Sequence, residues 1–375
     1  MKSDENDLKA FLEFYHESQN RLKKKTAEYN KSLRKDTNPL VRTFKTDLAD
    51  LNAGGKMLRG MLVGLGYRIA GHADTEESDG LALAFEIFQT GILVHDDVID
   101  NAGTRRGKMT VQRRYGERLE RRGIRMVSSS EKPEEIAKST AICAGDIGIY
   151  CANKKIADDY GKNPDCAKLI SSFDEIVINT IRGELLDIVL PYELQDQSLD
   201  KEKASLLLKK SVRDIYYLKT SCYSIIGPLH LGMLLGGAEE ADMKMMDGFA
   251  NELGIAYQIM DDILGIFADE EFLGKDVGSD ISEFKQTILY MYVHENDENA
   301  LKRLLEFYGK KKVTRGDLTE VRRIFRDSGA LSYAQEVLAS CFGRAERKLK
   351  RMSFVSEDDK AILRGFITYC KGRRK

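Results

Sequence analysis

The stretch LALAFEIFQTGILVHDDVID, residues 81–100, carries apolar residues at the three-to-four spacing of an amphipathic helix and ends in three aspartates. Four more long stretches share this helical spacing, at residues 8–29, 167–190, 204–227 and 245–267. Only five prolines interrupt the chain, and no strand–turn–strand pattern occurs. The sequence therefore predicts an all-α fold, a helical bundle packed around a buried centre.

No linker rich in proline, glycine or serine divides the 375 residues, and no repeat with a period of 20–50 residues is visible. We therefore expect a single domain over residues 1–375. The most irregular segment is residues 116–135, which is polar and predicts a surface excursion. Pro133 is expected in the first turn of the helix that follows.

Charge and cysteine content narrow the class of protein. The 59 basic and 60 acidic side chains nearly cancel, which argues against a protein that coats nucleic acid. The six cysteines form no CxxC pair, so a zinc or redox motif is not indicated, and reduced thiols fit a cytoplasmic protein. The N-terminal residues are too polar for a signal peptide, and no apolar run reaches the roughly 20 residues of a membrane span.

Two acidic clusters stand at the ends of apolar helical stretches. Asp96 and Asp100 are four residues apart, so they share a helix face, and Asp97 lies about 100° around the helix. Asp261 and Asp262 form a second acidic pair far along the chain. Such carboxylates repel one another unless divalent cations bind between them, and sparse oxygen ligands suit Mg²⁺. We expect the two helices to face each other and to hold metal ions between their carboxylates.

Basic residues accompany the acidic clusters. Lys56 and Arg59 lie three residues apart in GGKMLRG, residues 54–60, and Arg105 and Arg106 follow the first cluster. Further lysines stand near polar turns, at Lys219, Lys275 and Lys285. A site that combines many acids, many bases and Mg²⁺ indicates diphosphate ligands, some bridged by metal and others bound directly by Arg and Lys.

Five stretches, taken together and in order, resemble the motifs of the trans-isoprenyl diphosphate synthases. HDDVID followed by RRG resembles the first aspartate-rich motif, and YQIMDDILG resembles the second. GGKMLRG resembles the N-terminal substrate-binding motif, LKTSCY the Lys-Thr motif, and GKDVGSDISEFKQT the lysine-bearing loop. The matches extend from residue 54 to residue 287. The resemblance implies an all-α bundle with a central cavity, usually homodimeric, that joins isopentenyl diphosphate head-to-tail to an allylic diphosphate.

The resemblance also assigns roles to single residues. Several Mg²⁺ ions on the allylic diphosphate would be bound by Asp96, Asp100 and Asp261, with Asp97 and Asp262 in support. The same diphosphate would be bound directly by Arg105, Lys219, Lys275 and Lys285. Isopentenyl diphosphate would be bound by Gly55, Lys56, Arg59, Gln89 and Arg106. Thr220 and Gln258 would flank the developing cation.

The sequence departs from the family pattern at three positions. Gly265 stands where many members carry a third aspartate of the second motif. Gly60 replaces the usual proline after the arginine of the N-terminal motif. Glu184 stands where many members carry glutamine, and Asp187 matches the acid that follows.

The helix that carries the first motif also predicts the length of the product. With a rise of 1.5 Å per residue, position −5 from Asp96 lies about 7.5 Å deeper in the cavity and position −8 about 12 Å deeper. Position −4 is Ile92, position −5 is Gly91 and position −8 is Phe88. In the family, aromatic residues at −4 or −5 accompany the fifteen-carbon product. Gly91 would leave that level open and Phe88 would close the tunnel below it, which predicts a geranylgeranyl or C25 product.

Three other functions share part of this pattern. A metal-dependent HD phosphohydrolase would use the His95-Asp96 pair, but its further histidine ligands are lacking. A class I terpene cyclase has the same bundle and acidic motifs, but it would not need Lys56, Arg59 and Arg106 for a second diphosphate. A non-catalytic subunit of a heteromeric prenyl synthase commonly loses the aspartates that this chain keeps.

Overall fold

Helices make up nearly all of the regular structure. The computed structural model describes residues 2–73, 75–105, 107–123, 132–196, 198–268, 278–310 and 312–372. The strands in this described part are β1 (Thr104–Arg105) and β2 (Lys108–Met109), which form one short antiparallel pair. The prediction of an all-α fold is therefore confirmed. Within the same ranges, no helix combines the length and the apolar character needed to cross a membrane.

The chain contains two compact units. The first comprises Met1–Phe11, Phe173–His230 and Ala238–Lys375, and the second comprises Leu12–Ser172 and Leu231–Gly237. Three helices have residues in both units, namely α1 (Lys2–Leu33), α7 (Cys166–Glu193) and α9 (Gly227–Leu235). The expectation that residues 1–375 act as a single domain stays a prediction.

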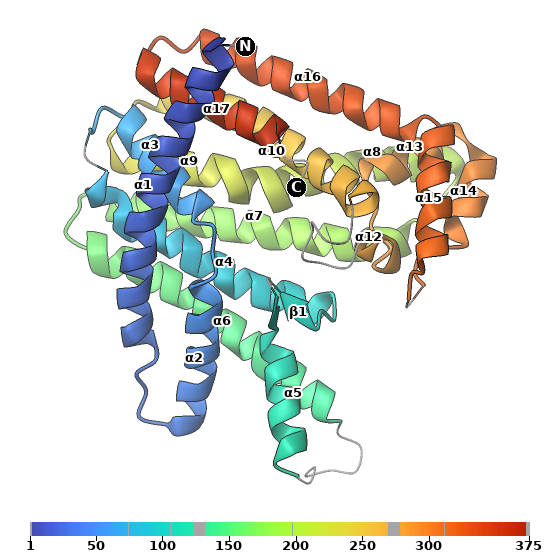
Figure 1. Cartoon of the computed structure of the whole chain (residues 1–375), viewed down its shortest axis with the longest axis horizontal. Coiled ribbons are helices and arrows are strands. Elements are labelled where there is room, and N and C mark those ends of the chain that lie inside the picture. Colours follow the sequence, from blue (N-terminus) through green and yellow to red (C-terminus); the bar gives the residue numbers. More distant parts are fainter. Residues whose placement is uncertain are drawn as a thin grey trace. The chain divides into compact units, whose positions relative to one another are not determined.

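The second unit is centred on α4 (Figure 1). Its remaining elements are α2 (Pro39–Asn52), α3 (Leu58–Ile69), the 3₁₀ turn η1 (Glu76–Ser78), α4 (Asp79–Ile99), α5 (Val111–Arg121) and α6 (Pro133–Tyr160). In α4, Leu81, Phe85 and Phe88 are completely buried, because this helix is apolar on more than one face. The core of the unit therefore surrounds the helix that ends in the first acidic motif.

Helices α4 and α6 approach each other closely through glycines. A Cβ atom on Gly91 would lie 2.8 Å from the carbonyl oxygen of Gly145, and one on Gly148 would lie 2.7 Å from the Cα atom of Gly91. Real Cβ atoms do not come so near to backbone atoms. The crossing of these two helices therefore requires that both positions lack a side chain.

The polar segment 116–135 is partly helical. Gly116 belongs to α5, which ends at Arg121, and α6 begins with Pro133 in its first turn, as expected. Residues 124–131 lie outside the described residues, so the predicted surface excursion stays a prediction there.

The first unit contains the second acidic motif. Its remaining helices are α8 (Lys201–Ile215), the π-helix η2 (Tyr216–Ile226), α10 (Glu240–Phe267), α12 (Ser279–Ser282), α13 (Ile288–Asn296), α14 (Glu298–Leu305), α15 (Arg315–Asp327), α16 (Ala330–Lys350) and α17 (Glu357–Lys371). Helix α10 packs against η2 and against α16, which runs along it in Figure 1.

The π-helix η2 is the most unusual element of the first unit. π-helical turns are rare and occur mostly at functional sites. Two glycines allow neighbouring helices to touch its backbone: a Cβ atom on Gly183 of α7 would lie 2.5 Å from the amide nitrogen of Lys219, and one on Gly254 of α10 would lie 2.5 Å from the Cα atom of Ser221. This packing fixes the segment that carries the Lys-Thr pair.

Candidate functional site

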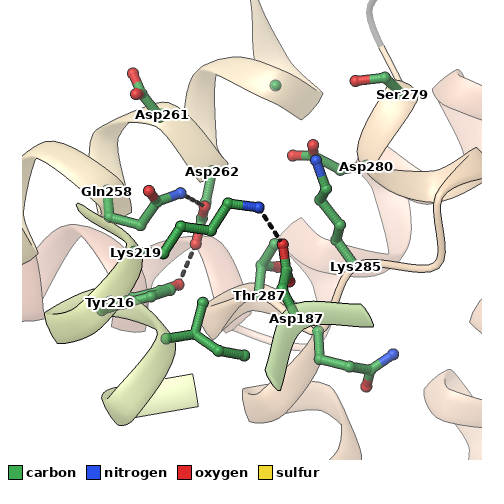
Figure 2. A pocket seen from close by; sticks show the side chains of 13 residues that line it. Asp187, Tyr216, Lys219, Gln258, Asp261, Asp262, Ser279, Asp280, Lys285 and Thr287 are labelled. Carbon is green, nitrogen blue, oxygen red and sulfur yellow. Dashed lines mark hydrogen bonds and ion pairs between the residues drawn. The ribbon is translucent and has the colours of Figure 1, made fainter. Parts of the chain in front are cut away.

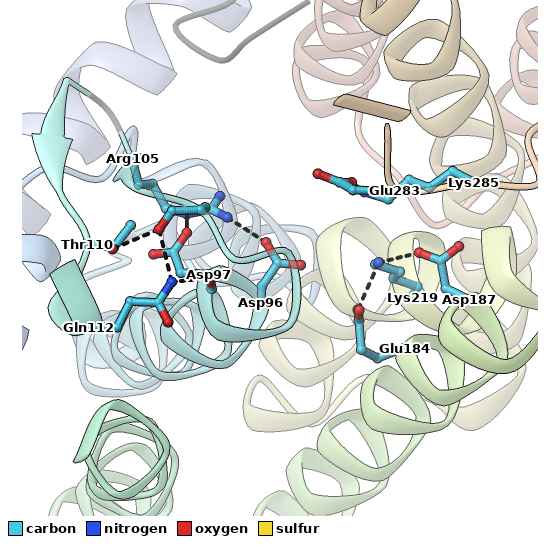
Figure 3. A network of polar contacts seen from close by, with 11 residues as sticks. Asp96, Asp97, Arg105, Thr110, Gln112, Glu184, Asp187, Lys219, Glu283 and Lys285 are labelled. Atoms are coloured by element: carbon cyan, nitrogen blue, oxygen red, sulfur yellow. Dashed lines mark hydrogen bonds and ion pairs between the residues drawn. The ribbon is translucent and has the colours of Figure 1, made fainter. Parts of the chain in front are cut away.

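The first acidic motif occupies the last turn of α4 in the second unit. Arg105 on β1 donates a hydrogen bond from Nη2 to Asp96 Oδ2 at 2.6 Å and a second, from Nε, to Asp97 (Figure 3). Asp97 is buried, whereas Asp96 and Asp100 are partly exposed. Asp97 therefore orients Arg105, and the other two aspartates can reach a ligand.

The aspartates raise the pKa of Arg105. Burial by itself would lower the pKa of the guanidinium, but the negative charges of Asp96 and Asp97 raise it above its ordinary value. Arg105 is therefore a cation at the motif.

Two residues that the sequence did not single out hold the loop after α4. Gln112 donates from Nε2 to the carbonyl oxygens of Asp97, at 2.8 Å, and Ala102, at 3.0 Å. Thr110 caps α5 and donates from Oγ1 to Ala102 at 2.9 Å. Neither residue bears a charge or belongs to a motif, so only the folded chain reveals its role. Arg106, predicted to bind the second diphosphate, lies outside the described residues.

The second acidic motif lines a cavity of about 280 Å³ in the first unit (Figure 2). Asp261 and Asp262 come from α10, Lys219 from η2 and Asp280 from α12, and Lys285 follows α12. The predicted residues Gln258, Lys219, Lys285 and both aspartates are thus gathered around one space. Lys275 lies outside the described residues.

The two adjacent aspartates have different surroundings. Asp262 is 3% exposed and accepts hydrogen bonds from the hydroxyl of Tyr216 and, at 2.8 Å, from Nε2 of Gln258. Burial, together with the like charges of Asp280 and Asp261, raises the pKa of Asp262 to about 8. Asp261 is only partly buried and points to a different side of α10 in Figure 2. Asp262 is therefore enclosed by neighbouring side chains, whereas Asp261 is partly exposed at the cavity.

A chain of hydrogen bonds connects the Lys-Thr pair to this aspartate. Thr220 donates from Oγ1 to Gln258, which in turn donates to Asp262. The Tyr216 hydroxyl, at the other side of Asp262, accepts from the backbone N–H of Ile288 at 2.8 Å. The predicted pair Thr220 and Gln258 is thus in direct contact. Tyr216, which the sequence analysis did not identify, holds the Asp262 end of this chain of hydrogen bonds.

Both described lysines of the cavity form ion pairs. The Nζ atom of Lys219 lies 2.6 Å from Asp187 Oδ2 and 2.8 Å from Glu184 Oε2, and that of Lys285 lies 2.6 Å from Glu283 Oε2. Asp187 and Glu184 come from the same face of α7. The lysines are therefore held in place by carboxylates before any ligand is bound.

The structure explains the glycine at position 265. A Cβ atom on Gly265 would lie 2.5 Å from Oδ2 of Asp280. The carboxylate of Asp280 therefore fills the space that an aspartate side chain at position 265 would need. Because Asp280 follows 15 positions later in the chain (280 − 265), only the fold brings the two positions together.

The N-terminal motif in the second unit surrounds a buried carboxylate. Glu86 is 3% exposed and accepts from the backbone N–H of Gly60 at 2.9 Å. A proline at position 60 has no N–H to donate, and any Cβ atom there would lie 2.8 Å from Cδ1 of Leu22, which accounts for the glycine. In the amide orientation that satisfies its neighbours, Gln89 donates to Glu86 at 3.2 Å and accepts from Nη1 of Arg59 at 2.9 Å. Glu86 was overlooked, although it is a lone charge in an apolar stretch.

The loop of this motif is held to α1. The carbonyl oxygen of Lys56 accepts from the hydroxyl of Tyr15 at 2.7 Å and from Nε2 of Gln19 at 2.9 Å, while the Lys56 side chain is exposed. Gly55 is buried, and a Cβ atom on it would lie 3.2 Å from Oε2 of Glu86. Gln89 therefore links Arg59 to Glu86, next to an exposed lysine.

The structure corrects one element of the prediction of product length. Gly91 does not leave open space, because the volume that a side chain would occupy is filled by the backbone of α6. Phe88 is completely buried and Ile92 is partly buried, so their proposed effect on chain length stays a prediction. A glycine next to a motif can mean an open cavity or a close helix contact, and here it means the contact.

Replacing Gly91 by phenylalanine is therefore expected to unfold the protein rather than to shorten its product. The side chain would force α4 and α6 apart, at a cost of at least about 3 kcal/mol. Thermal unfolding followed by circular dichroism measures this. Gly103→Phe is the matched control, because a Cβ atom on Gly103 meets nothing within 4 Å. A folded Gly91→Phe variant with a shorter product would restore the original prediction.

The candidate carboxylates suit a divalent cation that takes most of its ligands from water and phosphate. Among the described residues, no group of three or more His, Cys, Asp or Glu side chains is arranged to hold a metal ion by itself. The candidates offer only oxygen atoms, at Asp96 and Asp100 in the second unit and at Asp261 in the first. Mg²⁺ commonly binds through one or two carboxylates and completes its shell with water and phosphate oxygens, so this donor set suits it.

Comparison with known proteins places this arrangement in context. A family model described as polyprenyl synthetase matches residues 43–325. The short chain isoprenyl diphosphate synthase of Methanocaldococcus jannaschii is 29% identical over 290 residues, 76% of this chain and 76% of the relative. The geranylgeranyl diphosphate synthase of Sulfolobus acidocaldarius is 28% identical over 328 residues, 86% of this chain and 88% of the relative.

Other matches agree with these. The geranylfarnesyl diphosphate synthase of Aeropyrum pernix is 29% identical over 329 residues, 87% of this chain and 92% of the relative. Among solved structures, a geranylgeranyl pyrophosphate synthase from Corynebacterium glutamicum, complexed with isoprenyl diphosphate and magnesium, has a TM-score of 0.83 and 24% identity. It covers 96% of this chain and 98% of its own, which shows a common fold.

Proposed function

Because the chain belongs to the polyprenyl synthetase family, we propose that it is a prenyltransferase that joins isopentenyl diphosphate head-to-tail to an allylic diphosphate. Its product is then a longer prenyl diphosphate. The observation that carries this proposal is the cavity of the first unit, which Asp261, Lys219 and Lys285 all line. Carboxylates for a metal and ammonium groups for phosphate oxygens are the two requirements for a diphosphate leaving group.

Each group in the chain has a task in this reaction. Mg²⁺, held by Asp96, Asp100 and Asp261, would stabilise negative charge on the diphosphate. Arg105, Lys219 and Lys285 bind its oxygens directly and stabilise the charge that builds as the allylic C–O bond breaks. The hydroxyl of Thr220 and the amide of Gln258, fixed by their mutual hydrogen bond, present oxygen dipoles to the allylic cation.

The second substrate requires its own cations. Lys56 and Arg59 bind isopentenyl diphosphate, with Gln89 orienting Arg59. The double bond of this substrate attacks the cation only when the two are closely aligned, and this alignment is what binding supplies. Loss of a proton, for which the departed pyrophosphate is a suitable base, completes the step.

The finer parts of the proposal concern the product and the metal count. We propose several Mg²⁺ ions per active site and a geranylgeranyl or C25 product. Relatives named geranylgeranyl and geranylfarnesyl diphosphate synthase support both lengths. We also propose a cytoplasmic location, supported by six cysteines that all remain free thiols.

A homodimer is supported by an apolar stripe on α7. Ile178, Ile181, Leu185, Ile188 and Tyr192 are each at least 40% exposed and recur at alternating spacings of three and four residues. That spacing is the seam by which two helices pack together, so a second copy of this chain is the occupant we propose. Light scattering of the purified chain gives its mass in solution and tests this.

Product analysis tests the proposed function. The purified chain is incubated with Mg²⁺, isopentenyl diphosphate and each allylic primer in turn, and dephosphorylated products are separated by chromatography. We expect an elongated prenyl alcohol that depends on both substrates and disappears when EDTA removes the metal. Hydrocarbon formed without isopentenyl diphosphate would indicate a terpene cyclase, and release of phosphate alone would indicate a phosphohydrolase. If the chain alone forms no product, it is a non-catalytic subunit.

A further inference from the structure

Lys219 is shared between two carboxylates of α7. Its Nζ atom lies 2.8 Å from Glu184 and 2.6 Å from Asp187, and Figure 3 shows the ammonium between them. The two acids are 15% and 13% exposed, so water and salt screen these ion pairs only in part. One ammonium between two carboxylates leaves this group of three with a net negative charge.

The backbone enforces this arrangement. A Cβ atom on Gly183 would lie 2.5 Å from the amide nitrogen of Lys219, so α7 and η2 touch backbone to backbone at this point. Glu184 directly follows Gly183 and is therefore next to Lys219 whenever the two helices pack. Helix packing thus brings the two residues within reach of each other, and their side chains form the ion pair.

The rest of the cavity is also acidic. Lys219 and Lys285 are the basic residues among the described side chains that line it, and Lys285 is paired with Glu283 at 2.6 Å. Asp261 and Asp280 line the same space. A diphosphate is itself an anion of several charges, so without cations it meets repulsion here.

We propose that Glu184 is a specificity-determining residue, which makes this cavity reject free diphosphate and accept diphosphate only together with divalent cations. The inference rests on the proposed function. With glutamine at this position, Lys219 would face one carboxylate and could offer positive charge to a phosphate oxygen. With glutamate, the positive charge of the Lys219 ammonium is offset by the two carboxylates. Only when divalent cations bind these carboxylates can Lys219 release Glu184 and bind a phosphate oxygen instead.

Calorimetric titration with inorganic pyrophosphate tests this without turnover. The full chain and its Glu184→Gln variant are titrated in EDTA and again in Mg²⁺. Wild-type protein is expected to bind pyrophosphate weakly in EDTA and tightly with Mg²⁺, whereas the variant binds metal-free pyrophosphate at least about tenfold more tightly than wild type does. Glu193→Gln is the control, because it removes the same charge from an exposed position of α7 about 13.5 Å further along the helix.

A second variant tests whether Glu184 acts through the lysine. In a Lys219→Met background, Glu184→Gln should change metal-free binding by much less than tenfold, which a double-mutant cycle measures. If Glu184→Gln does not fold, Glu184→Met, similar in length and without charge, takes its place. Unchanged metal-free affinity in the folded variant, or an equal gain in Glu193→Gln, would overturn the inference. Failure of wild-type protein to bind pyrophosphate even with Mg²⁺ would instead count against the proposed function.

Discussion

Replacing Asp261 by asparagine is expected to lower the rate of prenyl transfer at least about 1,000-fold and to leave the fold intact. The side chain is partly exposed and lines the cavity, so the substitution removes charge without creating a void. An amide binds Mg²⁺ less strongly than a carboxylate does, and the leaving diphosphate then loses part of its stabilisation. The loss should appear in kcat and in the Mg²⁺ concentration needed for half-maximal rate.

Asp242→Asn provides the control for this experiment. Asp242 lies in the first turn of the same helix and its substitution removes the same charge. Its rate and Mg²⁺ dependence should match those of wild-type protein. If Asp261→Asn keeps full activity at low Mg²⁺, Asp261 is not a metal ligand and the metal must be held elsewhere.

The sequence alone was sufficient for the fold class and for the positions of both acidic motifs. Long apolar periodicity dictates helices, and aspartates at the ends of apolar helices are unusual enough to indicate a site. The residues by themselves could not separate Asp261 from Asp262, because adjacent aspartates look alike in a chain, and only the family resemblance gave them different roles. Their difference arises from the fold, which buries Asp262 and gives it a hydrogen bond from Tyr216, 46 positions earlier in the chain.

The roles of the glycines were the hardest to predict from the sequence. Gly91 was interpreted as open space, but its meaning depends on Gly145 and Gly148 of another helix. Gly265 looked like a lost aspartate, but the carboxylate of Asp280 fills its place. A residue without a side chain carries no pattern of its own, so the atoms that approach it can be known only from the folded chain.

Gly183→Ala is expected to lower both stability and activity. The new Cβ atom would lie 2.5 Å from the amide nitrogen of Lys219 and 2.8 Å from its Cα atom, so α7 and the π-helix η2 must move apart. We expect a loss of about 2–4 kcal/mol in the free energy of unfolding. A shift of Lys219 by about 1 Å should lower kcat about 100-fold, because catalysis by bound groups depends steeply on alignment.

Gly343→Ala separates this contact from the general effect of adding a methyl group to a helix. A Cβ atom on Gly343 of α16 would meet only the flexible end of Arg347, at 3.4 Å, so alanine there should stabilise the protein by up to about 1 kcal/mol. Urea unfolding of both variants and of wild-type protein measures the difference, and steady-state kinetics measures kcat. A Gly183→Ala variant as stable and active as Gly343→Ala would mean that the close contact of α7 with η2 does not position Lys219.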